Sequence, residues 1–128
     1  MYFDSDFASV EWNDDVKVAV LTWKKFASGE NFRNPSQKAL DLAISKKASK
    51  WYSNTLNAGV FSEEDRDWFN TKIVPTMLEN GINRSALIVP KSVISNISLK
   101  HAADAASKVG LAIKYFPNED EALEWLKH

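Results

Sequence analysis

The run of residues 16–23 constrains the fold most, because it is apolar on both of the faces that a β-strand presents. Its alternation of apolar and polar residues ends at Lys17, and the residues that follow are Val, Ala, Val, Leu, Thr and Trp. Such a run is typical of a strand in the middle of a sheet that is covered on both sides. The chain is therefore expected to bury this strand at the centre of a sheet.

A β-hairpin is predicted at the start of the chain. Ala8, Val10 and Trp12 alternate with polar residues, and the polar cluster of residues 13–15 separates them from the central run. Alternation of this kind predicts a strand with one buried face, and the cluster predicts the turn that follows it. The first strand is therefore expected to pair antiparallel with the central one.

Two helices are predicted in the first half of the chain. The first is expected over residues 35–47, with Pro35 at its first position. The second is expected to begin after Ser62, whose spacing to Asp65 makes a capping box. Pro75 lacks an N–H, so a kink or a short break is predicted in the second helix near residues 72–75.

The remaining elements follow from shorter signals. A short strand is expected at residues 51–52, and buried strands are expected at residues 85–90 and 111–116. Apolar residues at helical spacing predict a third helix over residues 98–110, and a last helix is expected to begin after Asn118.

The predicted order of elements is β-β-α-β-α-β-α-β-α, which defines an α/β fold. Strands that alternate with helices pair in parallel, and the hairpin adds one antiparallel neighbour. We therefore expect a mixed, mostly parallel five-stranded sheet with four helices. Neither an internal repeat nor a linker of biased composition interrupts the 128 residues, so residues 1–128 are expected to form a single domain.

This topology also predicts a homodimer. If the parallel strands lie in sequential order, their crossovers place the connecting helices on one side of the sheet. The other face of the central strand then lacks cover, and leaving its Val, Leu and Trp side chains in water is unfavourable. Two copies that pack this face against each other would bury it, whereas helices that divide between the two faces would leave nothing exposed.

Composition excludes several classes of function. A formal net charge of -1 provides no overall field for nucleic acid, and the chain has no cysteine for thiolate metal sites or disulfides. No apolar run approaches the ~20 residues that span a bilayer, and the acidic residues 1–6 differ from a signal peptide. We expect a cytoplasmic protein with neither a nucleic-acid partner nor a membrane span.

Catalytic chemistry has little support in the sequence. The chain has two histidines, His101 and His128, and both are expected on the surface. The acidic clusters are explained by turns and helix N-termini, and the four glycines form no phosphate-binding loop. No catalytic residue, metal or cofactor is therefore predicted.

Two segments carry a resemblance to a known family. Residues 50–68 read Lys-Trp-Tyr-Ser-Asn-x-x-Asn-x-Gly-Val-Phe-Ser-x-Glu-Asp-x-x-Trp, and residues 115–126 read Tyr-Phe-x-x-x-x-x-Ala-x-x-Trp-Leu. Together with the order of elements, they resemble the STAS superfamily, and more narrowly the small stand-alone SpoIIAA-like proteins of bacteria. The resemblance implies a SpoIIAA-like fold. Anti-sigma factor antagonists of this superfamily carry a phosphorylatable Ser in the loop after the third strand, which is equivalent to residues 53–59 here.

The candidate site lies where the parallel strands end. In an open parallel sheet, ligands and partners bind the loops beyond the carboxyl ends of the strands. A small-ligand or peptide site and ordinary loop polarity explain these polar residues about equally well. The loop of residues 53–59 is expected to matter for function while contributing little to stability. The candidate ligand- or partner-binding residues are Lys24, Ser53, Asn54, Thr55, Asn57 and Lys91.

Two functions are weighed from these observations. The leading one is a non-catalytic regulatory or protein-interaction module, which the STAS-like order and the lack of catalytic groups favour. The alternative is a carrier or sensor of a small molecule or lipid, which a distant likeness to CRAL-TRIO domains and the aromatic residues near the loops favour. An enzyme ranks third.

Overall fold

The computed structural model describes residues 2–59, 61–94 and 110–127. Six strands form one sheet in which spatial order follows sequence order. Strands β1 to β3 are antiparallel to their neighbours, whereas β3 to β6 are parallel, which confirms the mixed α/β sheet. The strands are β1 (Phe3–Asp4), β2 (Ala8–Asn13), β3 (Val18–Trp23), β4 (Lys50–Asn54), β5 (Arg84–Ile88) and β6 (Ala112–Phe116).

The sheet has one strand more than the five that were predicted. The extra strand, β1, has two residues and pairs with β2 at the edge of the sheet. Ser5 makes the connecting turn, because its hydroxyl accepts hydrogen bonds from the backbone N–H groups of Phe7 and Ala8. A strand this short carries no periodicity that a sequence pattern could reveal.

The helices are also divided more finely than expected. Residues 95–109, which contain most of the third predicted helix, lie outside the described part of the chain. The short helix α4 was not predicted. The helices are α1 (Glu30–Ser45), α2 (Glu63–Trp68), the π-helix η1 (Phe69–Ile73), α3 (Val74–Glu79), α4 (Lys91–Ile94) and α6 (Glu119–Lys127).

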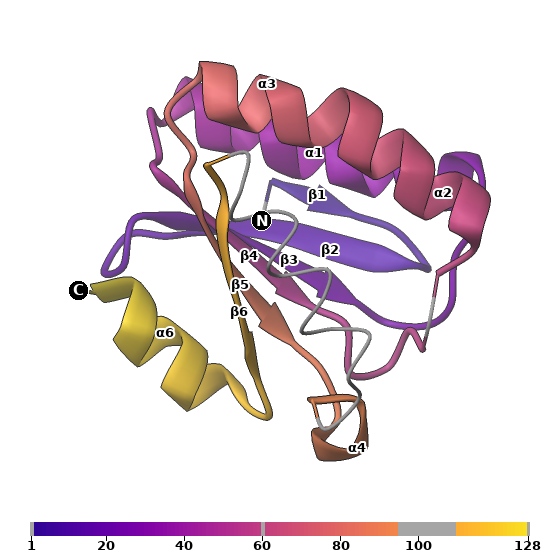
Figure 1. Ribbon diagram of the computed structural model, residues 1–128. Helices are drawn as coiled ribbons and strands as arrows, with labels where there is room; N and C mark the ends of the chain where they lie inside the picture. Colours follow the sequence, from indigo (N-terminus) through magenta and orange to yellow (C-terminus); the bar gives the residue numbers. More distant parts are fainter. Residues whose placement is uncertain (1, 60, 95–109, 128) are drawn as a thin grey trace.

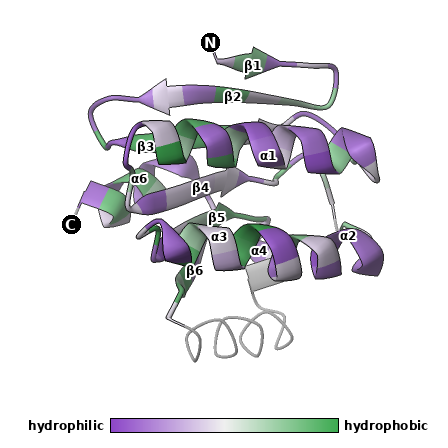
Figure 2. Ribbon diagram, turned by 90° about the horizontal axis from the view of Figure 1, so that it is seen from above, coloured by the Kyte–Doolittle hydropathy of each residue, from purple (hydrophilic) through white to green (hydrophobic). Residues whose placement is uncertain are grey.

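Strand β3 is covered on both faces, as its sequence predicts. Alternate residues of β3 belong to two separate hydrophobic cores, one containing Leu21 and Trp23 and the other containing Val18 and Val20. Figure 1 shows α1, α2 and α3 on one side of the sheet and α6 on the other. Seen from above, α1 and α3 lie side by side over the sheet, with many hydrophilic residues on the side turned away from it (Figure 2).

The expectation that the helices cover one face alone is therefore wrong. Helices α1 and α2–α3 connect parallel strands and share one side of the sheet, as expected for crossovers. Helix α6 follows the last strand and connects to no further strand of the described sheet, so no crossover fixes its side. Its residues Ala122 and Leu126 are buried against β3, β4, β5 and β6 on the opposite face. The argument for a homodimer assumed that this face was bare, and that premise does not hold.

The start of α1 also differs from the prediction. The helix begins at Glu30, and Pro35 lies inside it. Phe32 is the reason, because its ring stacks on Trp23 with 5.3 Å between centroids and is buried in the core. Burial of a large aromatic side chain outweighs the single hydrogen bond that proline removes near the start of a helix.

The predicted break at Pro75 is confirmed as a π-helical segment. Residues Phe69–Ile73 form η1 between α2 and α3, and Pro75 lies at the first turn of α3. Proline cannot donate the helical hydrogen bond to Thr71, and a π-turn changes the local bonding pattern at such a position. Two other helix starts are confirmed by their caps: Ser62 accepts a hydrogen bond from Asp65 N, and Asn118 accepts one from Glu121 N.

Phe32 is predicted to be essential for stability. Its ring lies 4.6 Å from that of Phe61 and 6.2 Å from that of Trp68, in addition to the stack on Trp23. Phe32→Ala should lower the free energy of unfolding by ~3–5 kcal/mol, because it leaves a cavity among these rings. Phe26→Ala is the matched control, since Phe26 is 51% exposed, and it should cost under ~0.5 kcal/mol. Urea denaturation of both variants measures the difference, and equal losses would contradict this role of Phe32.

Candidate functional site

The parallel strands β3, β4 and β5 end at the same edge of the sheet, which we call the carboxyl edge. The loops that leave this edge are residues 24–29 after β3, residues 55–59 and 61–62 after β4 and the start of α4 after β5. All six predicted site residues belong to these loops, to the last two residues of β4 or to the start of α4. The predicted parallel topology is therefore present. The positions of the side chains determine which groups at this edge are accessible for binding.

Ser53 and Asn54 end β4 and point to opposite sides of the sheet. Ser53 is 5% exposed, so its hydroxyl is buried rather than presented to a partner. Asn54 is half-buried, and its Oδ1 accepts a hydrogen bond from Leu56 N, which forms the turn at the end of the strand. The Asn54 side chain is thus used in a turn of the fold, and the Ser53 side chain is buried in it.

Thr55 joins the ends of two strands. Its hydroxyl donates a hydrogen bond of 2.7 Å to the carbonyl of Ile88, and its backbone N–H donates one of 2.9 Å to the same oxygen. The bond ties the β4 loop to the last residue of β5. The expectation that this loop contributes little to stability did not include this bond, and it stays a prediction.

The remaining candidates lie apart from each other. Lys24 forms an ion pair with Asp4 and donates a hydrogen bond to the carbonyl of Ser5, so it is turned toward β1. Asn57 is exposed in the β4 loop, and Lys91 is the exposed first residue of α4. Lys24 thus faces the edge strand β1, whereas Asn57 and Lys91 lie after β4 and β5, respectively.

Two apolar residues that the sequence analysis did not single out are exposed at the same edge. Phe26 in the β3 loop is 51% exposed, and Leu56 in the β4 loop is 40% exposed. In each loop a neighbouring alanine, Ala27 or Ala58, is buried, so the backbone is anchored while the larger side chain faces solvent. Which apolar residue of a loop is exposed and which is buried depends on the folded structure. A sequence pattern therefore does not identify such residues.

A buried carboxylate fixes the starts of the helices behind this edge. Asp65 in the first turn of α2 is 2% exposed, and its Oδ2 accepts a hydrogen bond of 3.1 Å from Gly29 N at the start of α1. The same oxygen accepts a hydrogen bond of 2.9 Å from the Ser62 hydroxyl. One side chain therefore holds the N-termini of both helices, where a negative charge is favoured by the helix dipoles.

Arg33 completes this buried group. Its Nε lies 3.6 Å from Asp65 Oδ1, and its guanidinium lies over the ring of Trp68 at 5.3 Å from the centroid. The Nε atom is buried and has no hydrogen-bond partner among the described residues, so the contact with Asp65 is electrostatic. The pair neutralises a charge that would otherwise be costly to bury.

Tyr52 is a second buried polar group, on the α6 side of the sheet. Its side chain is fully buried, and its hydroxyl donates a hydrogen bond of 3.0 Å to Glu119 Oε2 at the start of α6. Burial is the main cause, and the charge of Glu119 the second, of a phenol pKa raised well above its usual value of 10.0. The bond anchors α6 to the centre of the sheet.

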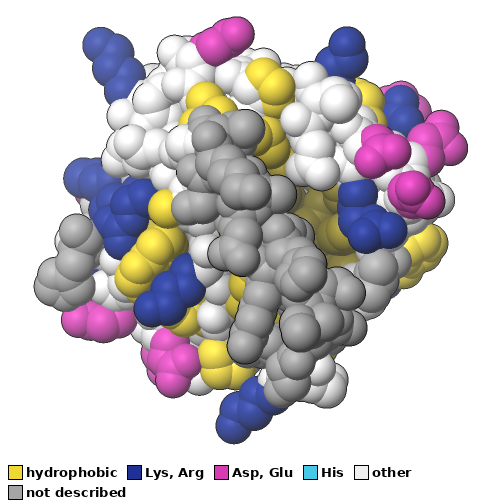
Figure 3. All heavy atoms as spheres, viewed as in Figure 1, with side chains coloured by type: hydrophobic (Ala, Val, Ile, Leu, Met, Phe, Trp, Pro, Cys, Tyr) yellow, Lys and Arg dark blue, Asp and Glu magenta, His cyan; other side chains and the backbone are white. Residues whose placement is uncertain are grey.

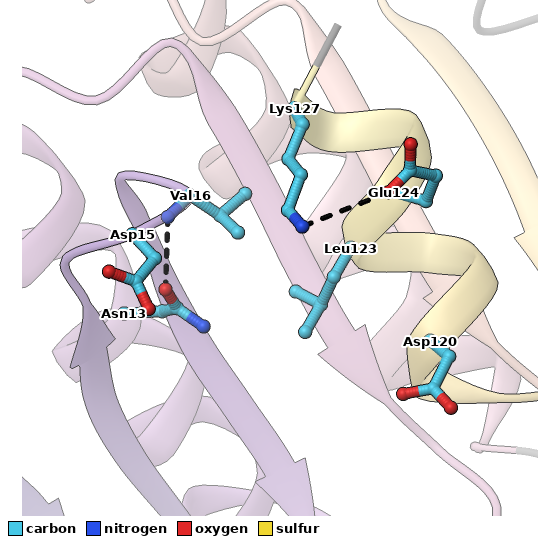
Figure 4. A pocket seen from close by; sticks show the side chains of 7 residues that line it. All are labelled: Asn13, Asp15, Val16, Asp120, Leu123, Glu124 and Lys127. Atoms are coloured by element: carbon cyan, nitrogen blue, oxygen red, sulfur yellow. Dashed lines mark hydrogen bonds and ion pairs between the residues drawn. The ribbon is translucent and has the colours of Figure 1, made fainter.

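Two hollows flank α6. The first, of about 310 Å³, lies between the β2–β3 turn and α6. Figure 4 shows Leu123 pointing from α6 toward this turn, where Asn13 Oδ1 accepts a hydrogen bond of 3.0 Å from Val16 N. Lys127 Nζ lies 3.7 Å from Glu124 Oε2, three residues earlier on α6, at the rim of this hollow. The second hollow, of about 570 Å³, lies between α6 and β6.

The described part of the chain offers no site for a metal ion built from three or more His, Asp or Glu side chains. It also contains no helix long and apolar enough to cross a membrane.

This architecture, with its sequentially ordered sheet and its helices on both sides, is a SpoIIAA-like fold. It is similar to the crystal structure of an uncharacterised protein of the DUF3478 family, with a SpoIIAA-like fold, from Shewanella loihica PV-4. The likeness has a TM-score of 0.63 at 15% sequence identity and covers 97% of this chain and 98% of that chain. It confirms the SpoIIAA-like fold that the resemblance of residues 50–68 and 115–126 implied. No family model matches the chain, and no curated protein matches it.

The Asp65 bridge is predicted to stabilise the fold through both oxygens of its carboxylate, since Oδ2 accepts the hydrogen bonds and Oδ1 faces Arg33. Asp65→Asn replaces one of these oxygens with an amide group and removes the charge opposite Arg33, so the free energy of unfolding should fall by ~2 kcal/mol. Asp67→Asn is the matched control, because Asp67 is exposed two residues further along α2, and it should change stability by under ~0.5 kcal/mol. Urea denaturation at neutral pH measures both. Similar losses in the two variants would show that the bridge is unimportant.

Tyr52 is predicted to make stability depend on alkaline pH. The unfolded phenol ionises near its usual pKa of 10.0, whereas the folded one stays protonated, so its contribution is complete below that pH and is lost as the pH rises above it. Tyr52→Phe should lower the free energy of unfolding at neutral pH by ~1 kcal/mol through the lost hydrogen bond and should flatten its decline between about pH 10 and 12. Urea denaturation at neutral pH measures the loss of stability, and denaturation at a series of alkaline pH values measures the decline. Tyr2→Phe is the control, since Tyr2 is 50% exposed, and an unchanged decline in Tyr52→Phe would contradict the assignment.

Proposed function

We propose that the protein is a non-catalytic regulatory module that binds a protein partner through the carboxyl edge of its sheet. The exposure of Phe26 and Leu56 in the two neighbouring loops of this edge is the observation that carries the proposal. Exposed large apolar residues in neighbouring loops are characteristic of protein-binding surfaces. The SpoIIAA-like fold is compatible with such a module, although a fold alone does not define an activity.

The arrangement of the polar candidates supports an apolar contact at this edge. Ser53 is buried, Thr55 is bonded to Ile88, and Lys24 is paired with Asp4. The Ser53 side chain is therefore buried, and the Thr55 hydroxyl and the Lys24 ammonium are engaged within the fold, whereas Phe26 and Leu56 are presented on anchored loops. An anchored loop loses little conformational entropy on binding, which favours association.

A carrier of a small apolar molecule has less support. Such a carrier needs a concave and mostly apolar cavity that buries its ligand. The hollows beside α6 are lined in part by the carboxylates of Asp120 and Glu124, and burying these against a lipid chain would be unfavourable.

A cytoplasmic location and a homodimer stay predictions.

The proposal predicts that the two apolar side chains are needed for partner binding and dispensable for folding. In affinity purification from an extract of the native cells, the double variant Phe26→Ser/Leu56→Ser should retain much less partner protein than the wild type does. Its melting temperature should stay within a few degrees of the wild type, because both side chains are largely exposed.

Tyr2→Ser is the matched control for surface hydrophobicity. Tyr2 is also an exposed large apolar residue, but it lies at the β1 edge of the sheet. This variant should retain the same proteins as the wild type. Equal retention by the double variant, or a wild type that retains nothing above background, would contradict the proposed function.

A further inference from the structure

The end of α3 carries the only Asn-Gly dipeptide in the sequence, Asn80–Gly81. Asparagine is one of the thermolabile residues, because the backbone nitrogen of the following residue attacks the carbon of its side-chain amide. Glycine at the following position favours this attack, since it has no Cβ to shield its nitrogen and allows the backbone the widest range of conformations. The position of the dipeptide in the fold therefore determines whether this reaction occurs.

The dipeptide is accessible to solvent. Asn80 and Gly81 are both exposed, and they lie where the chain leaves α3 on its way to β5. Figure 3 shows that the surface over α3, at the top of the view, consists largely of uncharged polar side chains and backbone. Gly81 has a φ of +80°, and apart from its chain neighbours no described atom lies within 4 Å of the position that a Cβ would take. The described part of the chain therefore leaves open space around this glycine.

The bonds that hold the dipeptide in place belong to the last turn of the helix. The Asn80 Nδ2 atom donates a hydrogen bond of 2.8 Å to the Thr76 carbonyl, and the Gly81 N–H donates a longer one of 3.2 Å to the Leu78 carbonyl. An exposed last turn opens at low free energy while the core stays folded. Opening of this turn frees the side-chain amide and the attacking nitrogen together.

We propose that Asn80 is a site of spontaneous deamidation in the folded protein. The Gly81 nitrogen forms a bond to Asn80 Cγ, the Cγ–Nδ2 bond breaks, and the proton of the Gly81 N–H leaves with the amide group as ammonia. The product is a five-membered succinimide ring. Water then opens the ring at one of its two carbonyl carbons, which receives the hydroxyl, and the other proton of the water goes to the Gly81 nitrogen. Opening at Cγ gives aspartate, and opening at the main-chain carbonyl gives isoaspartate, whose backbone runs through Cγ.

Both products are expected to weaken the end of α3. Each loses the Nδ2 donor to Thr76 and places a carboxylate at a helix C-terminus, where a negative charge is unfavourable. Isoaspartate also lengthens the backbone by one carbon close to Ile82, which is fully buried and donates a hydrogen bond of 2.8 Å to the Met77 carbonyl. The end of α3 precedes β5 and so lies at the edge of the sheet opposite the carboxyl edge. The inference is therefore independent of the proposed function.

The test follows the mass of the full chain during incubation in a native buffer of mildly alkaline pH. Deamidation exchanges an amide for a carboxylate, which adds about 1 Da. Peptide mapping by tandem mass spectrometry locates the change and distinguishes isoaspartate from aspartate. We expect the gain at Asn80, with a rate that rises with pH because the Gly81 nitrogen must lose its proton to react. The modified chain, separated by ion exchange through its extra negative charge, should melt a few degrees below the unmodified chain.

A pair of conservative variants assigns the gain to this residue. Asn80→Gln keeps the amide but moves it one carbon further away, so that attack would have to close a six-membered ring, and the gain should be abolished. Asn57→Gln is the matched control, because Asn57 is also exposed but precedes an alanine. This variant should gain mass at Asn80 as the wild type does.

Phe32→Ala tests whether the reaction needs global unfolding. This variant is predicted to raise the unfolded fraction of the chain by at least about a hundredfold. Local opening of the last turn of α3 does not depend on the rings around Phe32, so the rate of deamidation should change by less than about twofold.

Four results would overturn the inference. A wild type that gains no mass would exclude deamidation at this site, and a gain located at another asparagine would place it elsewhere. An acceleration of about a hundredfold in Phe32→Ala would assign the reaction to the unfolded chain. Equal gains in Asn80→Gln and Asn57→Gln would show that the Asn-Gly dipeptide is not its source.

Discussion

The hydrogen bonds of the buried Asp65 carboxylate, together with the rings packed around Phe32, are the interactions on which the α1 and α2 side of the sheet depends. The carboxylate accepts hydrogen bonds from Gly29 N and from the Ser62 hydroxyl, so it fixes where α1 and α2 begin. Phe32 follows one turn later and packs against Trp23, Phe61 and Trp68. Because polar and aromatic contacts hold the same two helix starts, the loops that lead into them have fixed ends.

These fixed ends explain why the carboxyl edge can present apolar side chains without losing its shape. The β3 loop ends at Gly29, and the β4 loop ends at Ser62, so both loops end at the Asp65 bridge. Thr55 holds the beginning of the β4 loop to β5 through Ile88. The exposed Phe26 and Leu56 therefore project from short segments that are held at both ends, which limits the entropy lost when a partner binds.

The sequence predicted those elements whose signals are local. The apolar run of β3, the Ser62 and Asn118 caps and the break at Pro75 each depend on residues close together in the chain, and all are confirmed. The start of α1 was wrong because the burial of Phe32 depends on Trp23 and on rings far along the chain. The same limit applied at the site, where polarity suggested free hydroxyls at Ser53 and Thr55, but one is buried and the other is bonded.

The position of α6 shows how one element without a crossover shapes a whole face. Helices between parallel strands are confined to a side by the handedness of the connection, whereas a helix after the last strand is free to pack on either side. Here Ala122 and Leu126 of α6 bury the second face of the sheet, and Tyr52 holds the start of the helix through Glu119. Covering this face removes the apolar surface from which a homodimer was predicted. It also places the acidic first turn of α6 beside Phe116 and Trp125, so the hollow between α6 and β6 results from the way in which the sheet is covered.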